Sequence, residues 1–391
     1  MRRFLIGLAG GFGAGYLALR TVQAVRDLRE PAPALEQDAK AYGRLRRRLM
    51  LVGIARSLAE LAFVAYGPGA ALAPRDGTPE PRPRRVALLG AALALSTVLD
   101  LPAAYVEGPV VERRFGLSKQ TPRAWALDHL KAFGVSFAIG LVLLEALATT
   151  IERFPRTWPL LATAATFPLL VLANVVAPNL IMPLFNEFKP LEGPLERRLR
   201  ALAAPYGADD AAILRVDMSR QTEKANAYVT GLFGSKRIVV GDTLLEHFAE
   251  PEIEFVVAHE LGHFVSRDVW RGVGIGTAAA AAVYIGAKLI AERGPSLASA
   301  AGLGRLFFAA SLLGLAIGPP MAAFMRTREA AADRFALAAT RDAQAGIDAF
   351  VRLRARNLAE DEQPRWMELL FSSHPSLRSR IADLERARSV S

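Results

Sequence analysis

The sequence predicts a mainly α-helical, polytopic membrane protein that crosses the bilayer seven times and carries a folded polar domain. Hydrophobic residues make up 52% of its 391 residues and charged residues only 22%. The apolar residues gather into seven runs whose lengths approach or reach the roughly 17–25 residues that a bilayer core requires. A long polar segment, from about Pro178 to Trp270, separates the fifth run from the sixth. Seven such runs are too many for the buried helices of a soluble protein.

The expected spans fall into a group of five and a group of two. They are Phe4–Leu19, Leu49–Tyr66, Val86–Val106, Ala132–Ile151, Trp158–Val176, Gly272–Ile290 and Leu303–Met321. No clear small-x-small cleavage site follows the first run, so we expect an uncleaved signal anchor rather than a signal peptide. We therefore divide the chain into spans one to five (1–177), a polar segment (178–270), spans six and seven (271–323) and a C-terminal polar segment (324–391).

Basic residues are unevenly distributed between the loops. The loops after the first and third spans are the richest in arginine and lysine, as in Arg44-Leu45-Arg46-Arg47-Arg48. Because cytoplasmic loops carry such an excess, we expect the N-terminus outside and the C-terminus inside, although Arg2 and Arg3 favour the opposite orientation. The net charge of +10 suits an anionic membrane surface. We expect the lipid bilayer as a partner and, without a nucleic-acid-binding motif, no nucleic acid.

Four charged residues lie within the expected spans. Arg56 and Glu60 are four residues apart in the second span, Asp100 lies in the third and Glu145 in the fourth. Charged groups are costly in hydrocarbon and usually face a bundle interior or water. They indicate either snorkelling at helix ends with an intrahelical Arg56–Glu60 pair, or a hydrated chamber enclosed by the helices. The sequence leaves both interpretations open.

The polar segment contains the pattern His-Glu-x-x-His in an apolar helical run. Side chains four residues apart share one face of an α-helix, so His259 and His263 can both point at one metal ion. Glu260 lies beside them, where it can reach a metal-bound water. The chain has no cysteine, so any metal must be held by His, Asp or Glu. The pattern is typical of a zinc metallopeptidase and predicts a zincin-like α+β catalytic domain.

A site with two histidines needs a third protein ligand. Glu329 and Asp333 follow the seventh run and are four residues apart on one helical face. Glu329 could coordinate zinc, and Asp333 could accept the free ring N–H of a zinc-bound histidine. The alternative is that Glu329 and Asp333 belong to a solvated, alanine-rich helix face. We disfavour it because His259 and His263 alone leave the metal site without a third protein ligand. Glu260 would then act as general base towards a water whose pKa zinc lowers to about 7.

Two further features could handle a substrate. Asn226–Gly231 and Lys236–Gly241 flank a short turn and predict a β-hairpin. An edge strand there could bind a peptide by strand addition, or the hairpin could be only structural. His374 could donate a hydrogen bond to the oxyanion or could be a structural cap before the last helix. His129 and His247 we interpret as surface or structural residues.

At this point the sequence resembles the integral-membrane CAAX prenyl protease family of type 1, the seven-span zinc metalloproteases. The matching motifs are Glu112–Thr121, Pro183–Phe188, Asn226–Tyr228, Ser235–Val240, the His259–His263 core, Arg326–Asp333 and His374-Pro375. Met325 and Ser376 depart from the usual family residues, serine and proline. The resemblance implies a helical barrel that encloses a water-filled chamber, capped by the catalytic domain.

The resemblance also implies one zinc ion per chain on His259, His263 and Glu329, with Glu260 as base. It implies that His374 contacts the oxyanion and that the substrate is bound by a set of residues near the site. These substrate-binding residues are Asn226, Ala227, Tyr228 and Arg326. Family members cut the last three residues from C-terminal prenylated Cys-a-a-X peptides, and some also cut further upstream.

The sequence is compatible with three functions. The first is a membrane-embedded zinc endopeptidase acting on CAAX-like peptides, and the second is a quality-control protease for misfolded membrane proteins. The third is a non-catalytic transporter or scaffold, which the intact Glu260 and Glu329 oppose. The alanine- and arginine-rich composition looks bacterial, so we expect an inner-membrane protein with its active site toward the cytoplasm. Its substrate would be a peptide or protein, lipidated or not.

Overall fold

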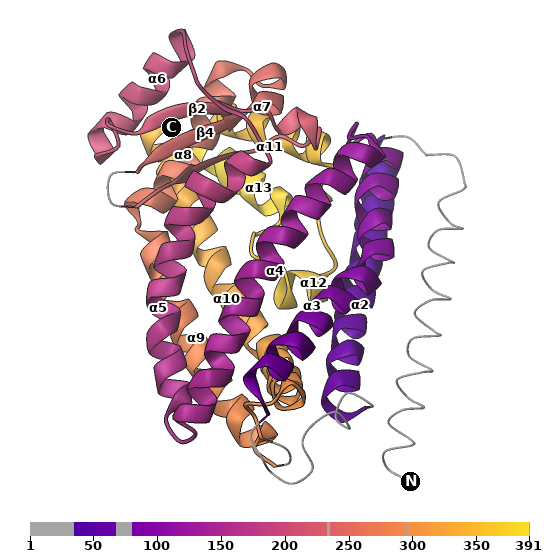
Figure 1. The fold of residues 1–391 in the computed structure, drawn as a ribbon. Coiled ribbons are helices and arrows are strands. Elements are labelled where there is room, and N and C mark those ends of the chain that lie inside the picture. The colour runs from indigo at the N-terminus through magenta and orange to yellow at the C-terminus, as the bar shows by residue number, and fades with distance from the viewer. Residues whose placement is uncertain (1–34, 68–79, 233–234, 294–295, 391) are drawn as a thin grey trace.

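The fold is a bundle of long helices with a mixed helix and sheet cap at one end (Figure 1). The computed structural model describes residues 35–67, 80–232, 235–293 and 296–390. Apolar segments form the long helices, and the polar segments form the cap. This confirms the mainly α architecture with a smaller α+β domain that the sequence predicts.

Six helices in the described ranges are long and apolar enough to cross a membrane. They are α2 (Leu35–Tyr66), α3 (Arg82–Tyr105, continued by the π-helix η2, Val106–Glu112), α4 (Pro122–Arg153), α5 (Trp158–Val176), α9 (Asp268–Ala291) and α10 (Ala300–Thr340). They contain the second to seventh expected spans. The expected first span, Phe4–Leu19, lies outside the described residues, so the count of seven stays a prediction.

Most of these helices extend beyond their apolar runs, because the flanking residues continue or cap the helix. In α4 the Thr121 side chain accepts a hydrogen bond from Ala124 N at 3.2 Å, and Pro122 occupies the first turn. This is a favourable start for a helix, because the threonine hydroxyl accepts a bond from an otherwise unpaired backbone N–H. Proline has no backbone N–H that would need a partner in the first turn. The α4 helix therefore begins ten residues before the expected span at Ala132.

The longest helix, α10, joins the bundle to the cap. Its 41 residues run from Ala300 to Thr340 without a break, through the boundary that we expected near residue 323. At about 1.5 Å per residue such a helix is roughly 60 Å long, twice the roughly 30 Å of a hydrocarbon core. One helix therefore provides both a span and, further along, the segment that carries Glu329.

The sheet in the cap has four strands in the order β1-β2-β4-β3. Their bounds are β1 Phe188–Pro190, β2 Ala212–Val216, β3 Ala227–Thr230 and β4 Arg237–Gly241. β2 and β4 are parallel, whereas β1 pairs with β2, and β3 with β4, in antiparallel fashion. The predicted hairpin is confirmed, and β3 is the edge strand of this sheet in the described part of the chain.

The remaining helices cover the sheet and connect it to the bundle. They are η3 (Ala177–Ile181), η4 (Met182–Leu184), α6 (Pro194–Ala203), η5 (Ala204–Tyr206), η6 (Met218–Arg220), α7 (Asp242–His247), α8 (Glu250–Val265), α11 (Ala343–Asn357), α12 (Arg365–Leu370) and α13 (Leu377–Val390). Val257 and Leu261 of α8 pack into one core with Ile238 and Val240 of β4. Burying these side chains fixes α8 between the sheet and α10.

The charged residues within the spans are paired with neighbouring helices. Arg56 Nη2 of α2 lies 2.6 Å from Asp100 Oδ1 of α3, and Arg56 Nε lies 3.7 Å from Glu60 Oε1. Glu145 of α4 is buried and contacts Arg85 of α3, with Arg85 Nη2 2.7 Å from Glu145 Oε1. These charges therefore join α2 to α3 and α3 to α4, in addition to the intrahelical pair that the sequence suggested.

Candidate metal centre and active site

Three side chains with metal-binding atoms meet between α8 and α10. His259 Nε2 lies 3.3 Å from Glu329 Oε2, and His263 Nε2 lies 3.3 Å from Glu329 Oε1. The helices can approach this closely because of Gly262, where an added Cβ would lie 3.1 Å from the Ala332 Cα. The structure therefore brings together the three expected metal ligands.

The geometry and chemistry of this group fit a metal ion such as zinc. Two donor atoms that are each about 2.0–2.1 Å from one tetrahedral zinc lie roughly 3.3–3.4 Å apart. The observed separations of 3.3 Å match this spacing, and donor atoms of all three residues lie within 4.8 Å of one another. Glu329 Oε2 is buried without a hydrogen-bond partner among the described residues. An unpartnered buried carboxylate oxygen is costly, and a cation would satisfy it.

The His259 ring is oriented by Asp333 and Arg380. His259 Nδ1 lies 2.8 Å from Asp333 Oδ1, which also accepts a 2.6 Å bond from Arg380 Nη2. The guanidinium of Arg380 lies over the Phe350 ring, 4.2 Å from its centroid. Asp333 thus occupies the expected place, whereas Arg380 was not predicted. Nδ1 bonded in this way leaves Nε2 free for a metal.

The His263 ring is oriented by a second carboxylate that the sequence analysis missed. His263 Nδ1 lies 2.9 Å from Asp268 Oδ2, and Arg328 Nε lies 2.8 Å from Asp268 Oδ1. The chain reverses at Arg267, which has a left-handed φ of 55°, and Asp268 then begins α9. An acidic residue between the motif helix and the span expected from Gly272 was the available signal.

The pKa values of both histidines reflect these carboxylates. Burial disfavours the imidazolium form, but the nearby carboxylates of Asp333 and Glu329 outweigh it and raise the pKa of His259 to about 9. Burial also opposes the charged form of His263, while Glu329 and Asp268 raise its pKa above the usual range. The site therefore attracts positive charge, either protons or a metal cation.

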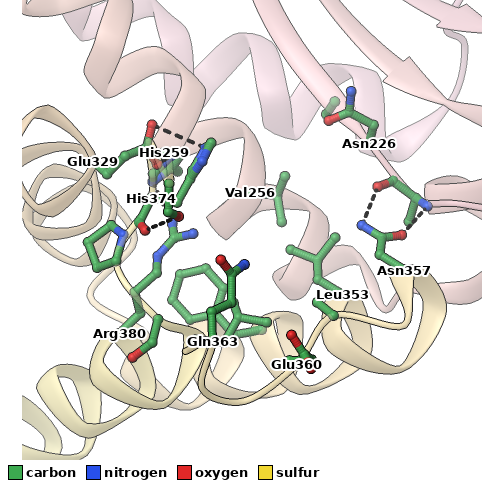
Figure 2. Close-up of a pocket in the computed structure, with 18 of the residues that line it drawn as sticks. Asn226, Val256, His259, Glu329, Leu353, Asn357, Glu360, Gln363, His374 and Arg380 are labelled. Atoms are coloured by element: carbon green, nitrogen blue, oxygen red, sulfur yellow. Dashed lines mark hydrogen bonds and ion pairs between the residues drawn. The ribbon is translucent and has the colours of Figure 1, made fainter. Parts of the chain in front are cut away.

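Glu260 and His374 line one cavity of about 380 Å3 with His259 and Glu329 (Figure 2). Burial raises the pKa of Glu260 above the usual carboxyl range. Burial lowers the pKa of His374, whose Nε2 lies 3.4 Å from Glu329 Oε1. Ser373 Oγ lies 2.8 Å from His374 Nδ1. Glu260 and His374 thus lie beside the expected metal ligands, and their catalytic roles stay predictions.

The four expected substrate-binding residues separate into two groups. Asn226 and Ala227 line the cavity, with the Asn226 side chain exposed. Tyr228 directs its hydroxyl to Met182 Sδ at 3.7 Å, and burial raises its pKa to about 12. Arg326 Nη1 donates to the carbonyls of Glu368 and Ser372 at 2.6 and 2.7 Å. Arg326 thereby holds the segment that leads to His374, and its binding of substrate stays a prediction.

The wall of the cavity opposite β3 was not predicted. It comes from the end of α11 and the segment that follows, with Leu353, Asn357, Glu360 and Gln363 facing the cavity (Figure 2). Val256 of α8 lies between this wall and the metal ligands. These residues carry no recognisable motif, and contacts between segments distant in sequence, such as the packing of α11 against α8, bring them to the site.

Profiles of known families cover most of the chain. Residues 191–388 match peptidase family M48, and residues 34–187 match the family described as CAAX prenyl protease N-terminal, five membrane helices. The junction of the two matches coincides with β1, where the bundle gives way to the cap. Both halves of the resemblance inferred from the sequence are thus confirmed.

The chain is also similar to individual metalloproteases and to a solved structure. The chain is 31% identical over 304 residues to the uncharacterized metalloprotease YhfN of Bacillus subtilis (strain 168), covering 75% of this chain and 71% of that protein. It is 32% identical over 272 residues to CAAX prenyl protease 1 of Saccharomyces cerevisiae, covering 64% of this chain and 60% of that protein. The crystal structure of Ste24p from S. mikatae shares the fold, with a TM-score of 0.73 at 24% identity over 98% of both chains. The chain therefore belongs to peptidase family M48, as a membrane-embedded metalloprotease similar to CAAX prenyl protease 1.

Proposed function

We propose that the protein is a zinc metalloendopeptidase that hydrolyses peptide bonds of CAAX-like substrates at the membrane. The observation that carries this proposal is the convergence of His259, His263 and Glu329. Glu260 lines one cavity together with His259 and Glu329. The cavity also reaches Ala227 at the start of β3, an edge strand that can hold an extended peptide. Metal ligands, a base and a peptide-binding edge are the parts that metal-assisted peptide hydrolysis needs.

In this proposal His259, His263 and Glu329 hold the ion, since two imidazoles and one carboxylate are a donor set of zinc peptidases. When bound, the ion would lower the pKa of a water molecule and polarise the scissile carbonyl. Glu260 accepts the proton of the attacking water and delivers it to the leaving amine. Burial raises the pKa of Glu260, which suits both steps. A group that acts first as a base and then as an acid works best when its pKa lies close to the ambient pH.

His374 is proposed to donate a hydrogen bond to the oxyanion that forms on the scissile carbonyl. If the Ser373 hydroxyl donates to Nδ1, the Nε2 atom keeps the ring proton and faces the metal ligands. The lowered pKa of His374 keeps the ring neutral at physiological pH. A neutral donor that is already in position can stabilise developing negative charge without reorganisation.

The substrate is proposed to be a peptide or protein, lipidated or not, that reaches the cavity from the membrane. Its backbone would pair with the free edge of β3, and the Asn226 side chain would contact it from the exposed side. The charge distribution of the loops supports an active site on the cytoplasmic side of a bacterial inner membrane.

The test is cleavage by the full-length protein in proteoliposomes, compared with Glu260→Gln at equal zinc content. The substrates are a prenylated Cys-a-a-X peptide, the same peptide without the lipid, and casein. We expect cleavage by the wild type and a loss of at least about 10²-fold in Glu260→Gln, because only the proton acceptor is removed. Cleavage of casein but not of the peptides would favour broad quality control. Bound zinc without Glu260-dependent cleavage of any substrate would contradict the proposal.

A further inference from the structure

The free edge of β3 presents backbone hydrogen-bonding groups at every second residue. On the paired side, Asn226 O accepts a hydrogen bond from Gly241 N at 3.0 Å. Because these groups alternate in direction along a strand, Ala225, Ala227 and Val229 turn their N–H and C=O groups to the opposite edge. No strand of the described chain pairs there. A peptide added to the sheet would therefore pair at these three positions.

Asn357 already occupies the first of these positions. Its Oδ1 accepts a hydrogen bond from Ala225 N at 2.8 Å, and its Nδ2 donates to Ala225 O at 3.2 Å (Figure 2). The carboxamide makes the pair of bonds that a neighbouring strand would make. Ala225 and Ala227 are both only 3% exposed, so the bonded carboxamide and not burial distinguishes the two positions. The usable edge therefore begins at Ala227, and Asn357 closes the cavity at this end.

The segment that follows Asn357 is held in place by α2. Asn357 ends α11, and Leu358 is buried with a left-handed φ of 47°. Glu360 forms an ion pair with Arg47 of α2, and these side chains are only 9% and 13% exposed. An added Cβ at Gly43 would lie 2.5 Å from the Glu360 carboxyl carbon, so α2 approaches this wall closely. The closed end of the cavity is thus supported by a membrane helix.

We propose that Asn357 limits how far a substrate extends past the cleaved bond and so restricts cleavage to bonds near the substrate's C-terminus. This inference rests on the proposed peptidase function. Antiparallel pairing, about two- to three-fold commoner than parallel pairing, directs the C-terminal residues of a peptide from Val229 towards Ala225 and Asn357. The metal ligands and Asn357 lie at opposite ends of the cavity, whose volume of about 380 Å3 takes a short segment.

The test uses the full-length protein in proteoliposomes and peptides that share one internal sequence but carry C-terminal extensions of increasing length. A second series carries N-terminal extensions, and mass spectrometry locates each cleaved bond. For the wild type, the cleaved bond should lie at a constant number of residues from the C-terminus of the peptide. Its position should not depend on the length of the N-terminal extension. Asn357→Ala should raise the yield of long C-terminal fragments, relative to short ones, by at least about tenfold.

Two matched variants accompany Asn357→Ala. Gln344→Ala alters an exposed amide on the same helix and should cleave as the wild type does. Asn357→Asp can still accept from Ala225 N but cannot donate to Ala225 O, so it should give an intermediate product pattern. Zinc content and thermal unfolding establish that each variant is folded. Unchanged products in folded Asn357→Ala, or cleavage that follows the N-terminus, would overturn the inference. Failure of the wild type to cleave any peptide would instead overturn the proposed function.

Discussion

At the scale of the residue, the two histidines proposed as metal ligands are oriented by carboxylates from different helices. Asp333 of α10 contacts His259, and Asp268 of α9 contacts His263. Each carboxylate is also bonded to an arginine, Arg380 or Arg328, so neither can easily turn away. The proposed metal centre therefore depends on three helices, although only two of them carry the proposed ligands.

The contact with Asp268 predicts an effect on metal binding. Asp268→Asn keeps the shape of the side chain but removes its negative charge. That charge raises the basicity of the His263 ring and helps to orient its Nε2 towards the proposed metal site. We expect zinc affinity to fall by about 10- to 100-fold, as for other partners of ligand histidines, measured by competition with a chromophoric chelator. Asp342→Asn alters an aspartate that caps α11 and contacts no histidine, so it should leave the affinity unchanged. Equal affinities in the two variants would contradict the role of Asp268.

The raised pKa values of the histidines predict that metal binding releases protons. Below a pKa of about 9 the metal-free His259 is mainly protonated, and zinc can bind only its neutral form. Zinc affinity should therefore fall as the pH is lowered through and below 9, by up to about tenfold per unit for each protonated ligand. Titration calorimetry at pH 7.5 in two buffers of different ionisation enthalpy should give different apparent enthalpies. Identical enthalpies would show that no proton is released.

Residues that share a helix could be predicted from spacing alone. His259, Glu260 and His263 follow from one motif, and Glu329 and Asp333 follow from the need for another ligand with a partner carboxylate. The structure brings these residues to one place, and their roles stay proposals. Asp268, Arg380 and Asn357 could not be predicted in the same way, because a chain reversal or the packing of distant helices brings them to the site.

At the scale of the element, the proposed metal centre depends on the distance between α8 and α10. Gly262 faces α10, and an added Cβ would lie 3.1 Å from Ala332 Cα and 3.2 Å from Phe335 Cβ. These contacts are tighter than ordinary van der Waals packing, so a larger residue must push the helices apart. The helix that carries two of the expected ligands would then move away from the helix that carries the third.

Gly262→Ala should therefore weaken zinc binding. Alanine improves helix propensity by about 1 kcal/mol, but overpacking against a neighbouring backbone costs about 1–3 kcal/mol. We expect lower zinc affinity and a lower unfolding temperature. Gly274→Ala in α9 is the control, since nothing lies within 4 Å of its added Cβ, and it should be neutral or stabilising. A Gly262→Ala protein that binds zinc as the wild type does would show that the helices tolerate the change.

The sequence predicts the elements better than their ends. The apolar runs locate the six described span helices, because a bilayer demands long apolar segments whatever the tertiary packing. The helix that carries Glu329 and Asp333 was expected, but its continuity with the seventh span in α10 was not predicted. Strands β1 and β2 were also missed, because they are short and their pairing partners are distant in sequence.

At the scale of the whole molecule, a metal ion would link segments that the chain separates by two spans. His263 ends the polar segment before α9, whereas Glu329 follows the apolar part of α10. A ligand that binds only the folded protein stabilises it by an amount that grows with its concentration, about 2.7 kcal/mol at 100 times its dissociation constant. The metal should therefore contribute to the stability of the fold as well as to its chemistry.

Removing the metal should accordingly lower the unfolding temperature in detergent. We expect a clear decrease after treatment with a chelator and recovery when zinc is added back. Glu329→Gln is the control, because a variant without the third ligand should show little response to either treatment. If the chelator leaves the unfolding temperature of the wild type unchanged, the metal does not have this structural role.

The most direct measurement of the central claim is the metal stoichiometry of the purified protein, by elemental analysis after dialysis against a weak chelator. We expect one zinc ion per chain in the wild type and in Glu260→Gln, because the proposed role of Glu260 is that of a base and not of a ligand. We expect almost none in Glu329→Gln, because α10 then supplies no ligand to the histidines of α8. Full zinc occupancy in Glu329→Gln would contradict a metal centre built from these two helices.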